Sequence, residues 1–218
     1  MPRLRAAALL FDMDGVLVDS RAVVERSWRR WAARRGLDPA PFLQVAHGRR
    51  TMETLREVRP DLELALEVAW LDAAELADVE GIVAVAGAAE LLRALPPASW
   101  AVVTSAGRDL VERRLGAAGL PRPRVLVSSE DVTRGKPAPD GYLLGAERLG
   151  RAAAECVVFE DSPPGTAAGR AAGARVVALT TTHRPDQLGE VAAVVADFRA
   201  VRVRGSAGDL TVELDPSG

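Results

Sequence analysis

The segment FDMDG, residues 11 to 15, places two carboxylates two positions apart directly after an apolar run. In an extended chain Asp12 and Asp14 project from the same side, while Gly15 allows the backbone to turn sharply. Two convergent carboxylates can attack an electrophile, exchange protons or hold a cation. Taken alone, the same spacing also fits an ordinary turn that ends a strand.

Two further polar groups follow later apolar runs. Thr104, Ser105 and Ala106 offer hydroxyls and free amides at an expected helix start, where a phosphate can bind. Glu160 and Asp161 precede a Ser-Pro helix start. Each group alone has a simpler interpretation, as a helix cap or as acidic residues that suit a helix dipole. The carboxyl ends of parallel strands meet at one edge of a sheet, so together they predict a single polar site.

Lys136, in the segment TRGKPAPD, is the only lysine of the chain. It follows the apolar run RVLV and therefore adds a cation to the same predicted edge. A solvated surface lysine is the simpler alternative. The position at a strand end, in a chain that otherwise uses arginine for its permanent positive charges, favours a functional interpretation.

The elements that would position these residues follow an alternating pattern. Short apolar runs, each bounded by polar, Gly or Pro residues, cover 7–11, 100–103, 124–127, 156–159 and 175–179. The segments between the later runs carry apolar residues at three- and four-residue spacing, as amphipathic helices do. This alternation predicts an α/β fold with a Rossmann-like, doubly wound parallel sheet.

One inserted segment interrupts this alternation of expected strands and helices. Residues 17–81 contain helical patterns and no convincing strand, so we expect a small α-helical cap domain there. The core is then discontinuous, comprising residues 1–16 and 82–218, with a C-terminal hairpin at about 201–214. Trp28, Trp31 and Trp70 lie on apolar faces of the insertion, which favours cap core over a ligand-stacking platform.

Composition narrows the possible partners. The net charge is −2 and both signs are interspersed, which predicts neither nucleic-acid binding nor attachment to anionic lipid. No apolar run is long enough to span a bilayer, and a single cysteine excludes an internal disulfide. We therefore expect a cytoplasmic protein with a small-molecule partner, and nothing in the sequence implies a protein partner.

The four strand-end groups together resemble the motifs of the haloacid dehalogenase-like superfamily. The resemblance runs from Phe11 to about Leu179 and holds for residue types, order and placement. Within the superfamily the chain looks like the phosphatase branch with a helical cap. The segments HGRRT, RGKPAPD and FEDSPPGTAAGRAAG are similar to the glycerol-3-phosphatase and 2-deoxyglucose-6-phosphatase group.

This resemblance implies a Mg²⁺-dependent phosphomonoesterase that acts on a small phosphorylated polyol or sugar. Asp12 would be the nucleophile that forms an aspartyl phosphate, and Asp14 the general acid and base. Ser105, or alternatively Thr104, would hold a phosphate oxygen beside Ala106. Lys136 would lie between the nucleophile and the phosphoryl group, where the broader fork of an arginine would compete for both aspartate oxygens.

The same resemblance implies a metal site. Its ligands would be the carboxylates of Asp12 and Asp161 and the backbone carbonyl of Asp14, because Mg²⁺ prefers oxygen ligands. Glu160 would be a further ligand or lie directly behind the ligands.

Two other functions stay open on the sequence alone. A sugar phosphomutase would return the phosphoryl group to a bound intermediate, and a non-catalytic relative would only bind a metabolite. Dehalogenases lack an acid at the position of Asp14 because a halide needs no proton, and the cap has no lysine such as phosphonate-cleaving and mutase members use. These features favour the phosphatase.

We expect residues of the cap to determine substrate specificity, since the core residues would contact only the phosphate group. The candidate stretch is HGRRT, with His47, Gly48, Arg49 and Arg50 between two expected helices. A structural histidine and a solvated pair of arginines are the alternatives.

Overall fold

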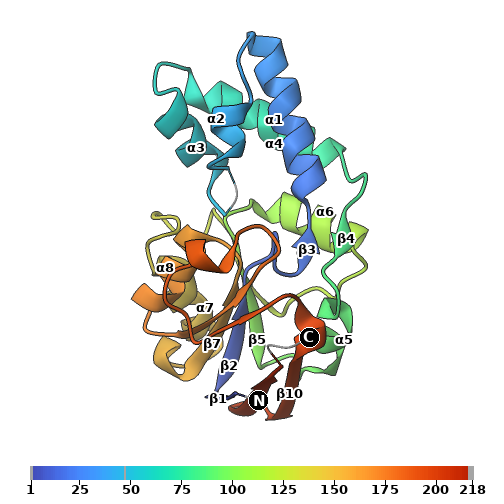
Figure 1. Ribbon diagram of the computed structural model, residues 1–218, viewed down its shortest axis with the longest axis vertical. Helices are drawn as coiled ribbons and strands as arrows, with labels where there is room; N and C mark the ends of the chain where they lie inside the picture. The colour runs from blue at the N-terminus through green and yellow to red at the C-terminus, as the bar shows by residue number, and fades with distance from the viewer. Residues whose placement is uncertain (1, 47, 216–218) are drawn as a thin grey trace.

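The computed structural model describes residues 2–46 and 48–215, and its centre is a six-stranded parallel sheet (Figure 1). The strand order is β6-β5-β2-β7-β8-β9. The strands are β2 (Ala8–Phe11), β5 (Trp100–Val103), β6 (Val125–Val127), β7 (Cys156–Glu160), β8 (Arg175–Leu179) and β9 (Ala193–Val195). Because β2 is flanked by β5 and β7, the strand order reverses there, and a ligand site is expected outside its carboxyl end.

Alternate residues of β2 face opposite sides of the sheet, and both sides are buried. Leu9 and Phe11 belong to one apolar cluster, and Ala8 and Leu10 belong to another. A strand covered on both faces needs apolar residues at every position, which explains the uninterrupted runs of the sequence. The Rossmann-like α/β fold predicted from those runs is confirmed.

Four helices cover the two faces of the sheet. The first cluster includes residues of α5 (Ala88–Ala94) and α6 (Arg108–Ala117). The second includes residues of α7 (Asp140–Arg148) and α8 (Pro163–Ala171). Three short 3₁₀ segments complete this part of the chain: η1 (Ala153–Glu155), η2 (Pro185–Gln187) and η3 (Phe198–Ala200).

A separate three-stranded antiparallel sheet lies at the end of the molecule away from the helices of residues 21–77 (Figure 1). The expected C-terminal hairpin is present as β10 (Val201–Ser206) and β11 (Asp209–Leu214). The third strand is β1 (Arg3–Ala6), which pairs with β11 and is separated from β2 by the single residue Ala7. The sequence did not predict this pairing, because it depends on contact between the two ends of the chain.

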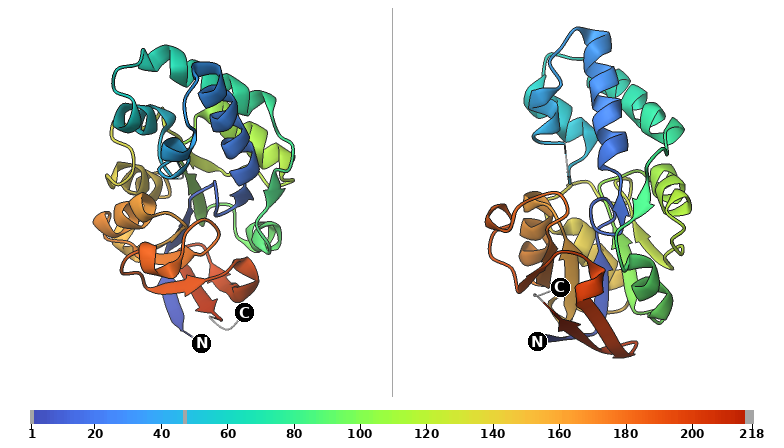
Figure 2. Two further views of the ribbon diagram at one scale, coloured as in Figure 1. Left: turned by 45° about the horizontal axis from the view of Figure 1, so that its top comes forward. Right: turned by 45° about the vertical axis from the view of Figure 1, so that its right-hand side comes forward.

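Four helices, here called the cap helices, lie between β3 (Val18–Asp19) and β4 (Val83–Ala84). They are α1 (Arg21–Arg35), α2 (Ala40–Leu43), α3 (Thr51–Val58) and α4 (Leu64–Ala77), and both views of Figure 2 show them grouped above the sheet. β3 and β4 pair as a two-stranded ribbon. The expectation that no strand occurs between residues 17 and 81 was therefore wrong at Val18–Asp19, because two-residue strands are too short to give a sequence pattern.

The cap helices enclose an apolar cluster of their own. Trp28 and Trp31 are buried in it beside Phe42, whose ring stacks on Trp28 with 5.5 Å between centroids. Trp70 packs against the cluster at its edge, under the guanidinium of Arg34. Within the described residues, no helix combines the length and apolar character needed to cross a membrane.

Candidate active site

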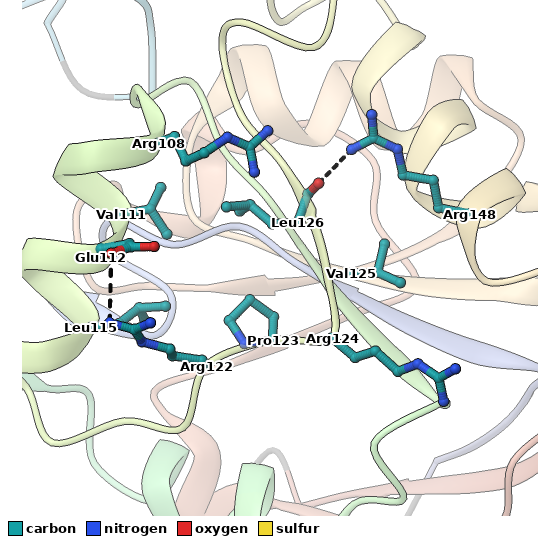
Figure 3. Close-up of a pocket in the computed structure, with 10 residues that line it drawn as sticks. All are labelled: Arg108, Val111, Glu112, Leu115, Arg122, Pro123, Arg124, Val125, Leu126 and Arg148. Carbon is teal, nitrogen blue, oxygen red and sulfur yellow. Dashed lines mark hydrogen bonds and ion pairs between the residues drawn. The ribbon is translucent and has the colours of Figure 1, made fainter.

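A cavity of about 540 Å³ lies between the carboxyl edge of the sheet and the cap helices. Asp12, Asp14, Thr104, Ser105 and Asp161 line it. A second cavity of about 420 Å³ lies against β6 and α6, and shares no lining residue with the first (Figure 3). Its arginines 108, 122 and 148 are already paired with carboxylates. The larger cavity is therefore the candidate site.

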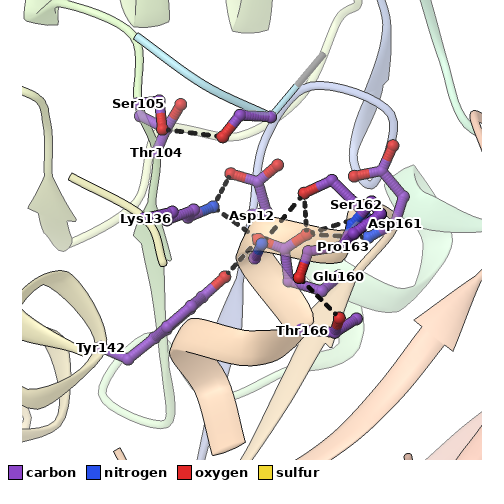
Figure 4. A network of polar contacts seen from close by, with 12 residues as sticks. Asp12, Thr104, Ser105, Lys136, Tyr142, Glu160, Asp161, Ser162, Pro163 and Thr166 are labelled. Carbon is purple, nitrogen blue, oxygen red and sulfur yellow. Dashed lines mark hydrogen bonds and ion pairs between the residues drawn. The ribbon is translucent and has the colours of Figure 1, made fainter. Parts of the chain in front are cut away.

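A buried lysine connects two of the strand ends. Nζ of Lys136 donates to Oδ1 of Asp12 and to Oε1 of Glu160, each at 2.6 Å (Figure 4). The lysine side chain is 7% exposed, and Nζ lies 5.2 Å from the centre of the Tyr142 ring. Burial alone would lower the pKa of Lys136, but the two carboxylates raise it overall, so the ammonium stays charged.

Glu160 is held by hydrogen bonds to both carboxylate oxygens. Oε1 accepts from Lys136 and from the hydroxyl of Tyr142, the latter at 2.8 Å. Oε2 accepts from the amides of Asp161 and Ser162 and from the Ser162 hydroxyl, at 2.9, 3.2 and 3.0 Å. Burial would raise the pKa of Glu160, but Lys136 and these donors lower it, so the residue is a fixed anion that orients Lys136.

The close approach of helix α8 to Glu160 depends on Gly165. A Cβ atom at this position would overlap the Glu160 carboxylate. The helix begins with Ser162 as its N-cap, whose hydroxyl accepts from the amide of Gly165 at 3.2 Å and also donates to Glu160. The start of α8 is thus shaped to hold this carboxylate.

The electrostatics of Asp12 and Asp161 show a shortage of positive charge. Burial raises the pKa of Asp12 to about 7 despite the opposing effect of Lys136, with Glu160 adding to the increase. Burial also raises the pKa of Asp161 well above its ordinary value, again helped by Glu160 and Asp12. Three carboxylates and one ammonium leave two negative charges uncompensated when all are ionised.

The three carboxylates can converge on one cation. Oxygen atoms of Asp12, Glu160 and Asp161 lie within 4.8 Å of one another. Oδ1 of Asp161 is buried and accepts no hydrogen bond within the described residues, whereas Oδ2 accepts from the hydroxyl of Thr182. A divalent cation would balance the two excess charges and use the orphaned oxygen, so the residues fit an oxygen-liganded metal.

The predicted phosphate-binding residues lie at the carboxyl end of β5. Thr104 is buried, and its Oγ1 accepts from the amide of Ala106 at 3.1 Å. The hydroxyl of Ser105 donates to the backbone carbonyl of Gly48 at 3.2 Å. Both residues line the cavity, and Ser105 is the more exposed of the two, so the choice between their hydroxyls for phosphate binding stays a prediction.

Asp14 is held by two donors of different origin. Oδ1 accepts from the hydroxyl of Ser20 at 2.6 Å and pairs with Nη1 of Arg114 at 2.8 Å. Gly15, with a φ of 80°, turns the backbone immediately after it, as the sequence predicted. The Asp14 side chain is 25% exposed and lines the cavity.

The cap stretch HGRRT contacts the core. Gly48 lies against Ser162, and Arg50 donates to the carbonyls of Val132 and Thr133 at 2.8 and 3.3 Å. Arg49 pairs with Glu57. His47 lies outside the described residues. Gly48, Arg49 and Arg50 line the cavity, but both arginines already have protein partners, so their contact with a substrate stays a prediction.

Several contributors to the site had no sequence signal. Tyr142 looks like a core residue of an amphipathic helix, and Arg114 looks like a solvated helix position. Thr182 follows a strand in an ordinary threonine run, yet its hydroxyl bonds Asp161. In each case only the packing of distant segments gives the side chain its role.

A family model described as haloacid dehalogenase-like hydrolase matches residues 6–173. The chain belongs to this family. The match includes the segments that carry Asp12, Lys136 and Asp161, and it confirms the family predicted from the four motifs.

Named relatives extend the match over nearly the whole chain. Hexitol phosphatase A of Escherichia coli (strain K12) is 41% identical over 216 residues, covering 96% of this chain and 100% of the relative. Glycerol-1-phosphate phosphohydrolase 2 of Saccharomyces cerevisiae is 34% identical, covering 93% and 86%. A crystal structure of a HAD family hydrolase from Deinococcus radiodurans R1, with bound phosphate and sodium, is 33% identical with a TM-score of 0.62, covering 87% and 90%. The prediction of a phosphatase of this family is confirmed.

Replacing Gly165 with alanine tests whether Glu160 must stay in place. Alanine favours a helix over glycine by up to about 1 kcal/mol, but here its Cβ would displace the Glu160 carboxylate and with it Lys136. We expect Gly165→Ala to lower kcat for p-nitrophenyl phosphate by at least about tenfold. Gly116→Ala in helix α6 is the matched control, because no other atom lies within 4 Å of a Cβ placed at that position. Equal activity of the two variants would contradict the role given to Glu160.

Thermal unfolding tests the cation site without relying on activity. In the folded state the raised pKa values of Asp12 and Asp161 favour bound protons, so stability without a cation falls as the pH rises through them. A cation replaces those protons, so its stabilising effect should grow with pH. At a fixed Mg²⁺ concentration, about 100-fold above its Kd at pH 8, we expect Tm to rise by about 5–10 °C at pH 8, and by less than half of that at pH 5.

The ligand assignment is checked by two single substitutions. Asp161→Asn should abolish most of the Mg²⁺-dependent rise in Tm, since it replaces the carboxylate that holds the orphaned oxygen with a neutral amide. Asp109→Asn, at an exposed position on α6, should keep it. If Asp161→Asn shows the parent's full Mg²⁺ response, the cation binds elsewhere.

Proposed function

We propose that this hydrolase releases phosphate from small phosphorylated polyols or sugars through an aspartyl-phosphate intermediate, with Mg²⁺ as its metal. The observation that carries the proposal is the arrangement around Asp12. One oxygen of this buried carboxylate is held by Lys136 at 2.6 Å, and a second acid, Asp14, follows two residues later on the same cavity wall. A nucleophile, a cation and an acid therefore meet at one edge of the sheet.

Asp12 is the proposed nucleophile. Lys136 engages Oδ1 and thereby fixes the carboxylate plane, which leaves Oδ2 to attack phosphorus. The new O–P bond forms as the bond from phosphorus to the substrate alcohol breaks. Glu160, with its oxygens fully used by protein donors, holds the ammonium where the phosphoryl oxygens arrive.

Asp14 is the proposed acid and base. In the first step it gives a proton to the leaving alkoxide, and in the second it takes a proton from the water that hydrolyses the aspartyl phosphate. The water oxygen ends in inorganic phosphate, and Asp12 is regenerated. The exposure of Asp14 to the cavity gives it access to both the leaving group and the water.

The proposed metal ligands are the carboxylates of Asp12 and Asp161 and the backbone carbonyl of Asp14. Bound there, Mg²⁺ would offset the repulsion between the attacking carboxylate and the phosphate. Glu160 is better placed to orient Lys136 than to bind the cation, because all its acceptor positions are occupied by protein donors. Ser105 and the amide of Ala106 would receive phosphate oxygens opposite the lysine.

The substrate class rests on relatives and on the cavity. The relatives at 41% and 34% identity are named as phosphatases of hexitol phosphate and glycerol 1-phosphate. A volume of about 540 Å³ accommodates a phosphorylated polyol of that size. The cap side of the cavity offers Arg49 and Asp72, which can exchange hydrogen bonds with hydroxyl groups.

A panel of phosphate monoesters tests this substrate class. We expect kcat/KM to be highest for hexitol and glycerol phosphates, above nucleoside monophosphates and phosphoglycolate, with turnover lost on Mg²⁺ chelation. Folded Asp12→Asn should show no phosphate release with any ester. A preference for nucleotides would refute the substrate class, and activity in Asp12→Asn would refute the nucleophile.

Exchange of Lys136 for arginine tests why this cation is a lysine. The buried position between Asp12 and Glu160 fits a compact ammonium, whereas a guanidinium would push the carboxylates apart. We expect Lys136→Arg to lower kcat by at least about 100-fold, as loss of a preorganised charge does. The reverse exchange at the neighbouring exposed ion pair, Arg134→Lys, should leave kcat unchanged. Near-parental activity of Lys136→Arg would show that any positive charge suffices.

A further inference from the structure

Arg114 is a buried arginine with one carboxylate on each side. It is 3% exposed, on helix α6. Nη1 pairs with Oδ1 of Asp14 at 2.8 Å, and Nη2 pairs with Oε2 of Glu75 at 2.5 Å. Glu75 is itself 7% exposed and belongs to cap helix α4. One guanidinium therefore joins the proposed acid of the core to the cap.

The energetics of burial make this contact hard to break. A guanidinium loses its hydration when buried, and only well-placed carboxylates compensate for that loss. Burial would lower the pKa of Arg114, but Asp14 and Glu75 raise it overall, so the cation is retained. Removing either carboxylate would leave one arm of the buried guanidinium without its acceptor, and so the positions of Asp14 and Glu75 are linked through Arg114.

The geometry of this contact concerns Asp14 in particular. Arg114 and Ser20 both bind Oδ1, so the rotation of the Asp14 carboxylate is fixed from two sides. Its neighbour Arg113 also joins α6 to α4, donating to the carbonyl of Leu76 at 3.2 Å, without touching Asp14. A comparison of these two adjacent arginines therefore distinguishes the effect of a contact between the helices from the effect of a contact with Asp14.

We propose that Arg114 is a positioning residue for Asp14 and that Glu75 holds Arg114 in place from the cap. The alignment of the acid with the leaving group then depends on the position of helix α4. This inference rests on the proposed role of Asp14 as the acid for the leaving group. Glu75 holds the guanidinium fork in the plane in which Nη1 meets Asp14. Arg114 acts on the substrate only through Asp14.

Two aryl esters without hydroxyl groups separate this role from substrate recognition. p-Nitrophenolate leaves with little help from an acid, whereas phenolate needs more. The measurement is kcat/KM for p-nitrophenyl phosphate and phenyl phosphate, at pH 7 and with Mg²⁺, in the full-length protein. The variants are Asp14→Asn, Arg114→Met, Arg114→Lys, Glu75→Gln and Arg113→Met, each checked for folding by circular dichroism and Tm.

For Arg114→Met we expect a loss of about 10–100-fold on phenyl phosphate and of less than about fivefold on p-nitrophenyl phosphate, in the same direction as Asp14→Asn. Arg114→Lys retains the charge but contacts only one carboxylate well, so its loss should be intermediate. Glu75→Gln should show a smaller selective loss on phenyl phosphate. Arg113→Met should keep the parental ratio of the two rates.

A double-mutant cycle supplies the decisive comparison. If Arg114 acts through Asp14, Arg114→Met should cause no further loss on phenyl phosphate in the Asp14→Asn background. A structural arginine would instead lower both rates equally, and by the same factor in both backgrounds. If Arg114→Met does not fold, the same cycle is run with Arg114→Lys and with Glu75→Gln.

Equal losses on the two esters would overturn the inference, and so would a loss from Arg114 substitution that persists unchanged in Asp14→Asn. A selective loss in Arg113→Met would also overturn it, by showing that any contact between α6 and α4 has this effect. The proposed phosphatase chemistry fails separately, if the parent protein hydrolyses neither ester.

Discussion

The ion pair between Lys136 and Asp12 is the interaction on which the rest of the site depends. A buried carboxylate is expensive to ionise, and the raised pKa of Asp12 shows that one lysine only partly compensates. Glu160 keeps that lysine in place, but it also adds negative charge beside Asp12 and Asp161. The site is consequently stable as an ionised set only with positive charge beyond that of Lys136, which a bound metal ion would supply.

The fold supplies this arrangement by bringing distant segments to one edge. Asp12 follows β2, and Glu160 ends β7, its direct neighbour in the sheet. Lys136 enters from the loop before α7, and the same helix contributes Tyr142 beneath Glu160. Polar residues that follow different strands meet at one site, because a parallel sheet places the carboxyl ends of all its strands at the same edge.

The sequence predicted those parts that depend on local pattern and chain direction. Strands covered on both faces need apolar runs, so five strands of the central sheet were recognised, and Asp12, Lys136 and Asp161 were expected together because each follows such a run. β9 and the pairing of β1 with β11 were missed, since short or edge strands depend on their partners. Arg114 was missed because a helical arginine looks the same whether water or a carboxylate surrounds it.

The difference between Lys136 and Arg114 shows how the two cations divide their tasks. Lys136 offers a compact charge to Asp12, the proposed nucleophile, and both its partners lie at the carboxyl edge of the core sheet. Arg114 offers a planar fork, which suits a link between two carboxylates on different parts of the chain. In the proposed mechanism, nucleophilic attack is thus organised by the core alone, whereas proton transfer to the leaving group draws on the cap. A substrate whose alcohol fits the cap would then meet an acid already aligned with it, and one that keeps the cap displaced would not.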